Sequence, residues 1–157
     1  MSTHSKLGFS EDETQAVVEA LNNLLANYQV HYQKLRNFHW NVVVKDFFEL
    51  HEQFEQEYEA VKLQIDEIAE RIRVFGKRPI STMKGYLETA EIEEAPEDTN
   101  SDQMVAEILK DFELLFSFLM DTIDAAGEIG DSATEDMATG YLKRLEQRHW
   151  MLTAWSK

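Results

Sequence analysis

The stretch FFELHEQFEQEYEAVKLQIDEIAERIRVF, residues 47–75, decides the fold of this chain. Its apolar side chains recur every three or four residues, which is the spacing of one face of an α-helix. Charged and polar residues fill the positions between them, so the predicted helix has an apolar face to bury. Asp46, with Glu49 as its reciprocal partner, is the expected N-cap, and Gly76 is the expected stop. The apolar positions are Leu50, Phe54, Val61, Ile65, Ile68, Ile72 and Phe75.

A second amphipathic helix precedes this one. Ser10, with Glu13 three residues later, forms a capping box that predicts its start, and its end is expected near Val43 or Val44. Only a very short turn then separates the two helices, which predicts a helical hairpin. The apolar positions are Val17, Leu21, Leu24, Leu25, Tyr28, Leu35, Phe38 and Val42.

The rest of the chain predicts two further long helices. One is expected from near Ser101 to the glycines at 127 and 130. The other is expected from Ser132, with Glu135 as its capping partner, to about Trp155.

Residues 77–100, between the second and third long helices, are irregular and partly acidic. One short helix, capped by Ser81, is expected there around Met83 to Thr89. The prediction is therefore an all-α four-helix bundle over residues 10–157, after a short tail at residues 1–9. The connection must travel most of the bundle's length, unless the second and third long helices are antiparallel neighbours.

The composition restricts the function classes. The 157 residues include 30 acidic and 15 basic side chains, a formal net charge of −15, and no cysteine. Disulfides and thiolate metal sites are thereby excluded. The acidic field repels DNA phosphates and attracts cations, although solubility or a halophilic host would also explain it.

No apolar run approaches the roughly 20 residues of a membrane span, and the first residues do not resemble a signal peptide, so a cytoplasmic protein is expected.

Four residues have the composition of a metal site. His39 lies one turn before the hairpin turn and His51 about one turn after it, so an antiparallel hairpin can make the two imidazoles neighbours. Asp66 and Glu70 lie one helical turn apart on one face. Imidazole and carboxylate together are a ligand set for Fe, Mn or Zn.

Helical geometry decides how these residues can meet. His51 and Asp66 are about 22 Å apart along one helix at about 1.5 Å per residue, so one chain cannot bring both to a single ion. We take His51 as zero and about 100° of rotation per residue. Glu55, Asp66 and Glu70 then lie at about 40°, 60° and 100°, whereas the apolar face of the same helix centres at about 280°. The ligand stripe therefore faces away from the bundle core, toward solvent or a partner.

A two-fold dimer would satisfy both constraints. If two copies of this helix pair antiparallel, residue i faces residue j with a constant sum i + j. A sum of 121 pairs His51 with Glu70, and Glu55 with Asp66. The same register places Glu59 opposite Lys62. Two identical metal sites per dimer would follow by symmetry.

Three segments resemble the signature of the Dps family, the DNA-binding proteins from starved cells, which are mini-ferritins of the ferritin-like superfamily. They are FHWN (38–41), FFELHEQF (47–54) and IDEIAERI (65–72), within a match from about Leu24 to Phe75. The rest is similar more loosely, including GDSATEDM (130–137). The resemblance implies a ferritin-like fold. It also implies ferroxidase ligands at His39 and His51 of one subunit and Asp66 and Glu70 of another, a second-iron carboxylate at Glu55, and an aromatic beside the site at Trp40.

The resemblance further implies a hollow homododecamer. Such a shell would bind Fe²⁺, oxidise it preferentially with hydrogen peroxide, store Fe³⁺ mineral and protect against oxidative stress. Glu128, Asp131 and Asp136 are candidates for a cation pore, with a solvated acidic turn as the alternative. Two features depart from the family: Val44 and Lys45 replace a common glycine in the turn, and no Lys/Arg-rich tail is present. Direct DNA binding is therefore not expected.

Two other functions compete with this interpretation. A di-iron oxidase or oxygenase would have its site inside the bundle, but the ligands face outward and the ExxH motif, Glu146 to His149, has no second copy. A DNA-compacting or adhesion scaffold without strong ferroxidase activity would not need intact ligands. His149 of the ExxH motif is expected to be a hydrogen-bonded core histidine and not a metal ligand. His31 is expected to be a packed or a surface histidine. The choice between peroxide and oxygen, and between iron and manganese or zinc, stays open.

Overall fold

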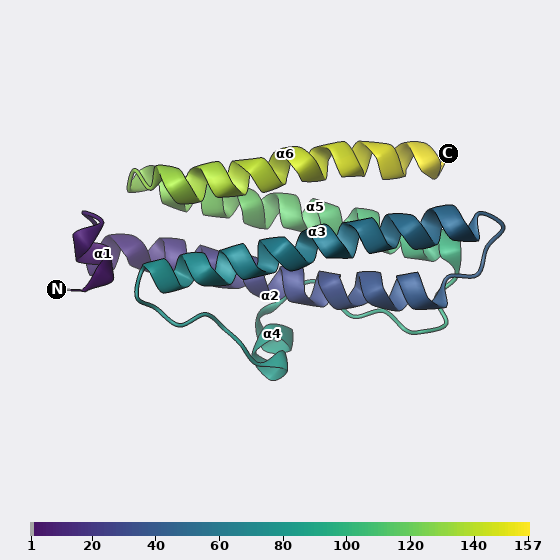
Figure 1. Ribbon diagram of the computed structural model, residues 1–157, viewed down its shortest axis with the longest axis horizontal. Helices are drawn as coiled ribbons and strands as arrows, with labels where there is room; N and C mark the ends of the chain where they lie inside the picture. Colours follow the sequence, from purple (N-terminus) through teal and green to yellow (C-terminus); the bar gives the residue numbers. More distant parts are fainter. Residues whose placement is uncertain (1) are drawn as a thin grey trace.

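Four long helices lie side by side in the computed structural model, which describes residues 2–157 (Figure 1). They are α2 (Glu11–Asn41), α3 (Phe47–Val74), α5 (Ser101–Glu128) and α6 (Ser132–Trp155). α2 and α3 form one antiparallel hairpin, α5 and α6 form a second, and α2 packs against α5. The predicted all-α four-helix bundle is confirmed. Within residues 2–157, no helix is long and apolar enough to cross a membrane.

The connection between the two hairpins runs along the outside of α2. α3 and α5 point in the same direction, so the chain must return over the bundle's length before α5 begins (Figure 1). The connection carries the short helix α4 (Met83–Thr89), which packs on α2. α3 and α5 are therefore not antiparallel neighbours, and the long crossing is the alternative that the structure adopts.

Asparagine side chains of α2 hold this connection in place. Asn22 Oδ1 accepts a hydrogen bond from the Ile80 amide at 2.9 Å. Asn27 Oδ1 accepts from the amides of Glu91 and Ile92, both at 2.9 Å, and Asn37 donates to the carbonyl of Ala95 at 2.9 Å. Backbone groups of an irregular segment need such partners when they are covered. The segment is thus attached to α2 at several levels of the helix.

Two predicted helix ends are confirmed. The Ser10 hydroxyl accepts from the Glu13 amide, and the Glu13 carboxylate accepts from the Ser10 amide, which completes the capping box. Gly76 has a φ of +79° and ends α3. Its amide donates to the carbonyl of Arg73, and the Lys77 amide donates to that of Ile72, which is a Schellman motif.

Two of the other predicted N-caps are wrong, and a third lacks its side-chain hydrogen bond. Asp46 is the N-cap residue of α3, as predicted, but its side chain makes no capping hydrogen bond, and its φ of −90° and ψ of 39° differ from the extended conformation that is usual at an N-cap. Thr82, not Ser81, caps α4 by accepting from the Gly85 amide. Asp131, not Ser132, caps α6 by accepting from the Thr134 amide at 3.2 Å.

The N-terminal segment contains a helix that the sequence did not predict. α1 (Thr3–Lys6) lies at one end of the bundle, and His4 within it is buried. Phe9 then packs edge-on against Phe75 with 6.2 Å between ring centroids. Met1, the first residue of the expected tail, lies outside the described residues.

The core contains the apolar face of α3. Leu50, Phe54, Val61, Ile68 and Ile72 are at most 2% exposed, as predicted. Ile65 is only half-buried and borders the core.

Between α2 and α5 lies a buried ionic cluster that the sequence did not predict. The Asp111 carboxylate, 1% exposed, accepts from His31 Nδ1 at 2.9 Å and from Lys34 Nζ at 2.8 Å. His31 is therefore a packed histidine. Between α3 and α6, the buried Glu57 accepts from Arg144 and Arg148 at 2.9–3.1 Å. Each carboxylate joins two helices through the bundle interior.

Replacing Gly76 by Ala should lower the free energy of unfolding by about 1–2 kcal/mol, because a left-handed backbone conformation is strained for any residue with a Cβ. An added Cβ would meet Thr3 at no less than 3.6 Å, so the cost is conformational, not steric. Gly140→Ala is the matched control: it lies inside α6 in open space and should raise stability by about 0.5–1 kcal/mol. Urea denaturation curves measure both, and shifts of the same sign would contradict the argument.

Candidate metal centre

The hairpin turn brings His39 and His51 into direct contact. His39 belongs to the last turn of α2, and His51 to the second turn of α3. Their rings stack with 3.7 Å between centroids and 14° between planes. His39 Nδ1 lies 2.7 Å from the carbonyl oxygen of His51, and His51 Nδ1 lies 2.7 Å from the carbonyl oxygen of His39. The predicted proximity of the two imidazoles is therefore confirmed.

These reciprocal hydrogen bonds fix the tautomer of both rings. A carbonyl oxygen can only accept, so each Nδ1 must carry the hydrogen. In the neutral ring the lone pair then lies on Nε2, which is the atom free to bind a metal. A ligating histidine commonly has its other nitrogen held in this way. The sequence did not predict these hydrogen bonds, because they depend on the exact level at which α2 and α3 meet.

Aromatic rings hold the histidine pair on both sides. Phe47 stacks on His51 with centroids 4.9 Å apart, and Tyr58 approaches His39 edge-on at 5.3 Å. Desolvation, with the neighbouring carboxylates of Glu55 and Glu59, raises the pKa of Tyr58, so its phenol stays protonated at neutral pH. Neither ring was singled out from the sequence, although their helical spacing from His51 places both near it.

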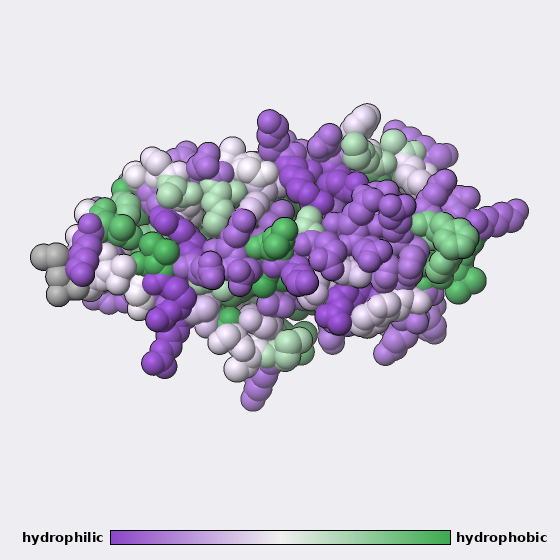
Figure 2. Space-filling model, viewed as in Figure 1, coloured by the Kyte–Doolittle hydropathy of each residue, from purple (hydrophilic) through white to green (hydrophobic). Residues whose placement is uncertain are grey.

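The predicted carboxylate ligands lie on the outward face of α3. Asp66, Glu70 and Glu55 are all exposed, whereas His39 is 7% exposed and His51 half-buried. Figure 2 shows mostly hydrophilic side chains on the face that carries α3. Asp66 also lines a groove of about 340 Å³ whose far wall includes Ile80 and Tyr86. In the part of the chain that the structure describes, no three His, Asp or Glu side chains converge to hold one ion.

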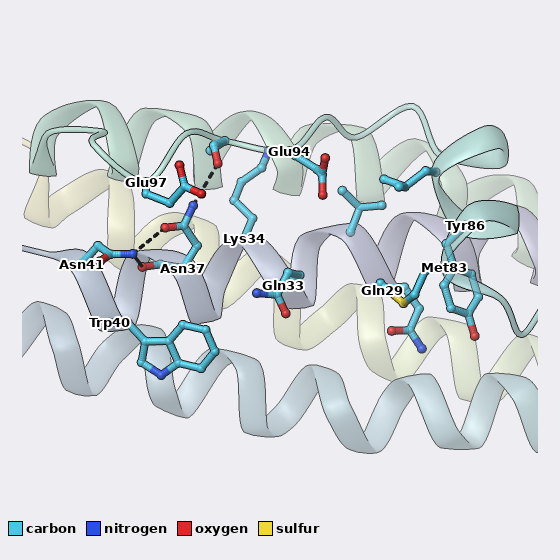
Figure 3. A pocket seen from close by; sticks show the side chains of 13 residues that line it. Gln29, Gln33, Lys34, Asn37, Trp40, Asn41, Met83, Tyr86, Glu94 and Glu97 are labelled. Carbon is cyan, nitrogen blue, oxygen red and sulfur yellow. Dashed lines mark hydrogen bonds between the residues drawn. The ribbon is translucent and has the colours of Figure 1, made fainter.

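A separate cavity of about 340 Å³ lies between α2, α4 and the acidic loop (Figure 3). Gln29, Gln33 and Asn37 line its α2 side, and Glu94 and Glu97 come from the loop. Trp40 lies at one end, 57% exposed, with the Arg36 guanidinium 4.9 Å from its ring. None of the four predicted ligands lines this cavity, so it is distinct from the histidine pair.

The three acidic residues proposed for a pore have different environments. Glu128 and Asp136 are exposed. Asp131 is only 2% exposed, and its Oδ1 accepts from Arg71 at 2.6 Å as well as from the Thr134 amide. The Asp131 carboxylate is therefore engaged in joining α3 to the start of α6. Glu128 and Asp136 are the two whose carboxylates are open to solvent.

His149 differs from its expected environment. Its side chain is 31% exposed, and Nε2 lies 4.0 Å from a Glu113 oxygen, beyond hydrogen-bond distance. The ring packs against Phe116 with centroids 5.5 Å apart. The expectation of a hydrogen-bonded core histidine is therefore wrong.

A ferritin-like family model matches residues 18–157 of this chain. General stress protein 20U of Bacillus subtilis is 40% identical over 90% of this chain and 98% of its own. DNA protection during starvation protein 2 of Bacillus anthracis is 42% identical over 88% of this chain and 94% of its own. The crystal structure of a Dps protein from Vibrio cholerae superposes with a TM-score of 0.93 at 40% identity, covering 96% of this chain and 95% of that one.

Fold and site together define a ferritin-like four-helix-bundle protein with a histidine pair beside an acidic helix face. The Vibrio cholerae protein is described as a member of the ferritin-like diiron-carboxylate superfamily. This chain belongs to the Dps family of mini-ferritins.

Proposed function

We propose that this protein oxidises Fe²⁺ with hydrogen peroxide at sites shared between subunits, and stores the Fe³⁺ product inside a cytoplasmic dodecameric shell. Such an activity would protect the cell from oxidative stress. The observation that carries the proposal is the histidine pair. Both Nδ1 atoms are held by backbone carbonyls, which leaves two Nε2 lone pairs directed away from their hydrogen bonds.

The carboxylates that would complete the site must come from another chain. Asp66 and Glu70 lie on the same exposed face of α3 as His51, but Asp66 is about 22 Å away from it along the helix axis. A second copy, paired antiparallel along α3, would place its Asp66 and Glu70 beside His39 and His51. Glu55 would then lie near the same site and is the candidate for holding a second iron.

Exposed apolar side chains support a contact with a second copy on this side of the molecule. Leu63 of α3 is 66% exposed, and Met83 and Leu87 of α4 are 63% and 48% exposed. Trp40, next to His39 in sequence, is 57% exposed. Apolar surface of this kind around a polar stripe is typical of an interface.

The chemistry explains why a two-iron site is useful. Two Fe²⁺ ions held together deliver two electrons to one peroxide, so the one-electron cleavage that releases hydroxyl radical is avoided. Neutral imidazoles and carboxylates suit both Fe²⁺ and Fe³⁺. Exposed Glu128 and Asp136 are candidates for attracting Fe²⁺ at a pore.

The proposal is tested by adding Fe²⁺ anaerobically and then peroxide. Ferric absorbance should rise rapidly, with about one peroxide consumed per two irons, on a particle of twelve 18.3 kDa chains, about 220 kDa. A monomer or a dimer at working concentration would contradict the proposed shell. Slow oxidation with one peroxide consumed per iron would contradict the paired-iron site.

Mixing two inactive variants should restore activity if each site is shared. His39→Ala/His51→Ala and Asp66→Ala/Glu70→Ala subunits are dissociated, mixed equally and reassembled. An interface between unlike chains then holds one intact site and one site without ligands. Random pairing makes about half of the interfaces unlike, so roughly a quarter of the wild-type sites should return.

The control for this mixture is each variant taken through dissociation and reassembly alone, which should stay inactive. Mass spectrometry of the intact particle verifies that mixed assemblies have formed. No recovery in verified mixed particles would show that one chain supplies all of its own ligands.

DNA binding is not expected at physiological salt, despite the names of the relatives. The formal net charge is −15, from 30 acidic and 15 basic side chains. Sequence-independent DNA binding needs clustered cations that release counterions from the phosphates. A gel-shift assay with plasmid should show no retardation at neutral pH. Retardation without added divalent metal would contradict the charge argument.

A further inference from the structure

The outward face of α3 carries an excess of negative charge. At about 100° per residue, seven charged side chains fall within an arc of about 80°, and all seven are exposed. Five are carboxylates and two are cations, so this outward stripe has a formal charge of −3 per chain. Its members are Glu52, Glu55, Glu59, Lys62, Asp66, Glu70 and Arg73.

The chain itself neutralises little of this charge. Lys62 lies 3.8 Å from a carboxylate oxygen of Glu59, and both side chains are more than half exposed. Arg73 donates to the backbone carbonyl of Lys77. Among the ion pairs in residues 2–157, Glu59 is the one carboxylate of the outward stripe that has a cationic partner. The carboxylates also act on their neighbourhood, since those of Glu55 and Glu59 help to raise the pKa of Tyr58.

Antiparallel pairing of two such stripes would bring ten carboxylates against four cations. The register in which His51 faces Glu70 also places Glu59 opposite Lys62, which offsets part of the repulsion. A net charge of −6 still remains along one contact. Like charges repel more strongly as water leaves the space between them, because the local dielectric constant falls.

A divalent ion in each of the two shared sites would remove most of this excess, lowering the net charge from −6 to −2. The carboxylates of the proposed ligands Asp66 and Glu70 are also the ones that such an ion would neutralise directly. The same ion would then be both the ligand of the site and the neutraliser of the interface.

We propose that divalent-cation binding and two-fold association of this chain are thermodynamically coupled, with the metal acting as an assembly ligand. This inference rests on the proposed function, because it uses the shared sites. A shared site is complete only in the dimer, so each bound ion lowers the dimer dissociation constant by the factor 1 + [M]/Kd. For two independent sites at a free metal concentration of 100 Kd, the expected change is about 10⁴-fold.

The test is sedimentation velocity over a dilution series of the full-length protein at low ionic strength. Zn²⁺ serves as a redox-inert probe that binds imidazole and carboxylate, and Mg²⁺ as the control that prefers oxygen ligands and water. With chelator or Mg²⁺ the particles should dissociate at higher protein concentrations than with Zn²⁺. Raising the NaCl concentration with chelator should also favour assembly, because salt screens exposed charges.

Two variants separate charge from ligation. Glu52→Gln removes two charges per dimer without changing a proposed ligand or the Glu59–Lys62 pairing, so in chelator it should dissociate at lower protein concentrations than the wild-type protein, and it should still bind Zn²⁺. Asp66→Asn/Glu70→Gln removes the repulsion and the ligands together, so it should assemble in chelator and not respond to Zn²⁺.

Calorimetric titration with Zn²⁺ distinguishes failure of this inference from failure of the proposed function. If Zn²⁺ binds to the wild-type protein but the dilution series is the same in chelator and Zn²⁺, the coupling is overturned: the ion is then held by a single chain, and the metal-binding part of the proposed function survives. If Zn²⁺ does not bind at all, the proposed metal site itself fails. Unchanged dissociation of Glu52→Gln in chelator would overturn the part of the proposal in which the charge of the outward stripe opposes association.

Discussion

The variant Asp66→Ala/Glu70→Ala is expected to lose rapid oxidation of Fe²⁺ by peroxide, with a rate reduced by more than about 100-fold. Changing groups that merely orient a metal's ligands commonly costs about 10- to 100-fold, and here two proposed ligands themselves are removed. Both side chains are exposed on α3, so truncation should change the free energy of unfolding by less than about 0.5 kcal/mol. Stopped-flow ferric absorbance measures the rate, and urea denaturation measures the stability.

The matched control is Asp12→Ala/Glu19→Ala. It also removes two exposed carboxylates from a long helix, but near the start of α2. Its oxidation rate should stay within about two-fold of the wild-type rate, since exposed charges there are screened at physiological ionic strength. Equal losses in the two variants would mean that general charge, not ligation, governs the reaction. If Asp66→Ala/Glu70→Ala oxidises Fe²⁺ at the wild-type rate, the assignment of these two residues as ligands is contradicted.

Asp111→Ala should lower the free energy of unfolding by about 3–5 kcal/mol, which is the usual cost of removing one partner from a buried ion pair. Asp111 is 1% exposed and accepts from both His31 and Lys34, so its loss leaves a buried ammonium without its main counter-charge. Glu107, 3.8 Å from Lys34 Nζ and 41% exposed, can compensate only partly. Domains of this size are stable by about 5–15 kcal/mol, so the loss is a large fraction.

Two comparisons decide whether burial causes this effect. Asp121→Ala removes an exposed carboxylate from the same helix and should change stability by less than about 0.5 kcal/mol. Lys34→Met/Asp111→Leu removes both charges and should recover most of the lost stability, because apolar replacements of a buried pair are often neutral or stabilising. A double variant as unstable as Asp111→Ala would mean that the packing, not the charge, is responsible.

The long helices could be predicted from the sequence because their information is local. The apolar spacing of residues 50–72 is sufficient to place the buried face of α3, and Ser10 with Glu13 is sufficient to place the start of α2. The N-caps of α4 and α6 were placed one residue away from the observed ones. Ser81 and Thr82 are adjacent capping residues, as are Asp131 and Ser132, and the backbone angles that choose between neighbours are set by tertiary contacts.

Of the predicted site, the contact between His39 and His51 and the exposure of the carboxylates could be predicted from the sequence. Counting turns from the hairpin brings His39 to the level of His51, and counting degrees places Asp66 outside the core. The hydrogen bonds that select Nε2 could not be predicted, because a shift of one residue between α2 and α3 would break them. Buried Asp111 was equally unpredictable: its partners are 77 and 80 residues away in the sequence, and composition gives no sign of them.

The reciprocal hydrogen bonds of His39 and His51 have a consequence for the order of events in assembly. Both imidazoles are immobilised by backbone atoms of their own chain, 2.7 Å from each ring. The rotamer entropy of these two side chains is therefore lost when the monomer folds, not when a metal or a second subunit arrives. Half of the proposed coordination sphere is preorganised in the isolated subunit. The exposed carboxylates of Asp66 and Glu70 would be the adaptable half of the proposed site, because their side chains are not held by other groups of the same chain.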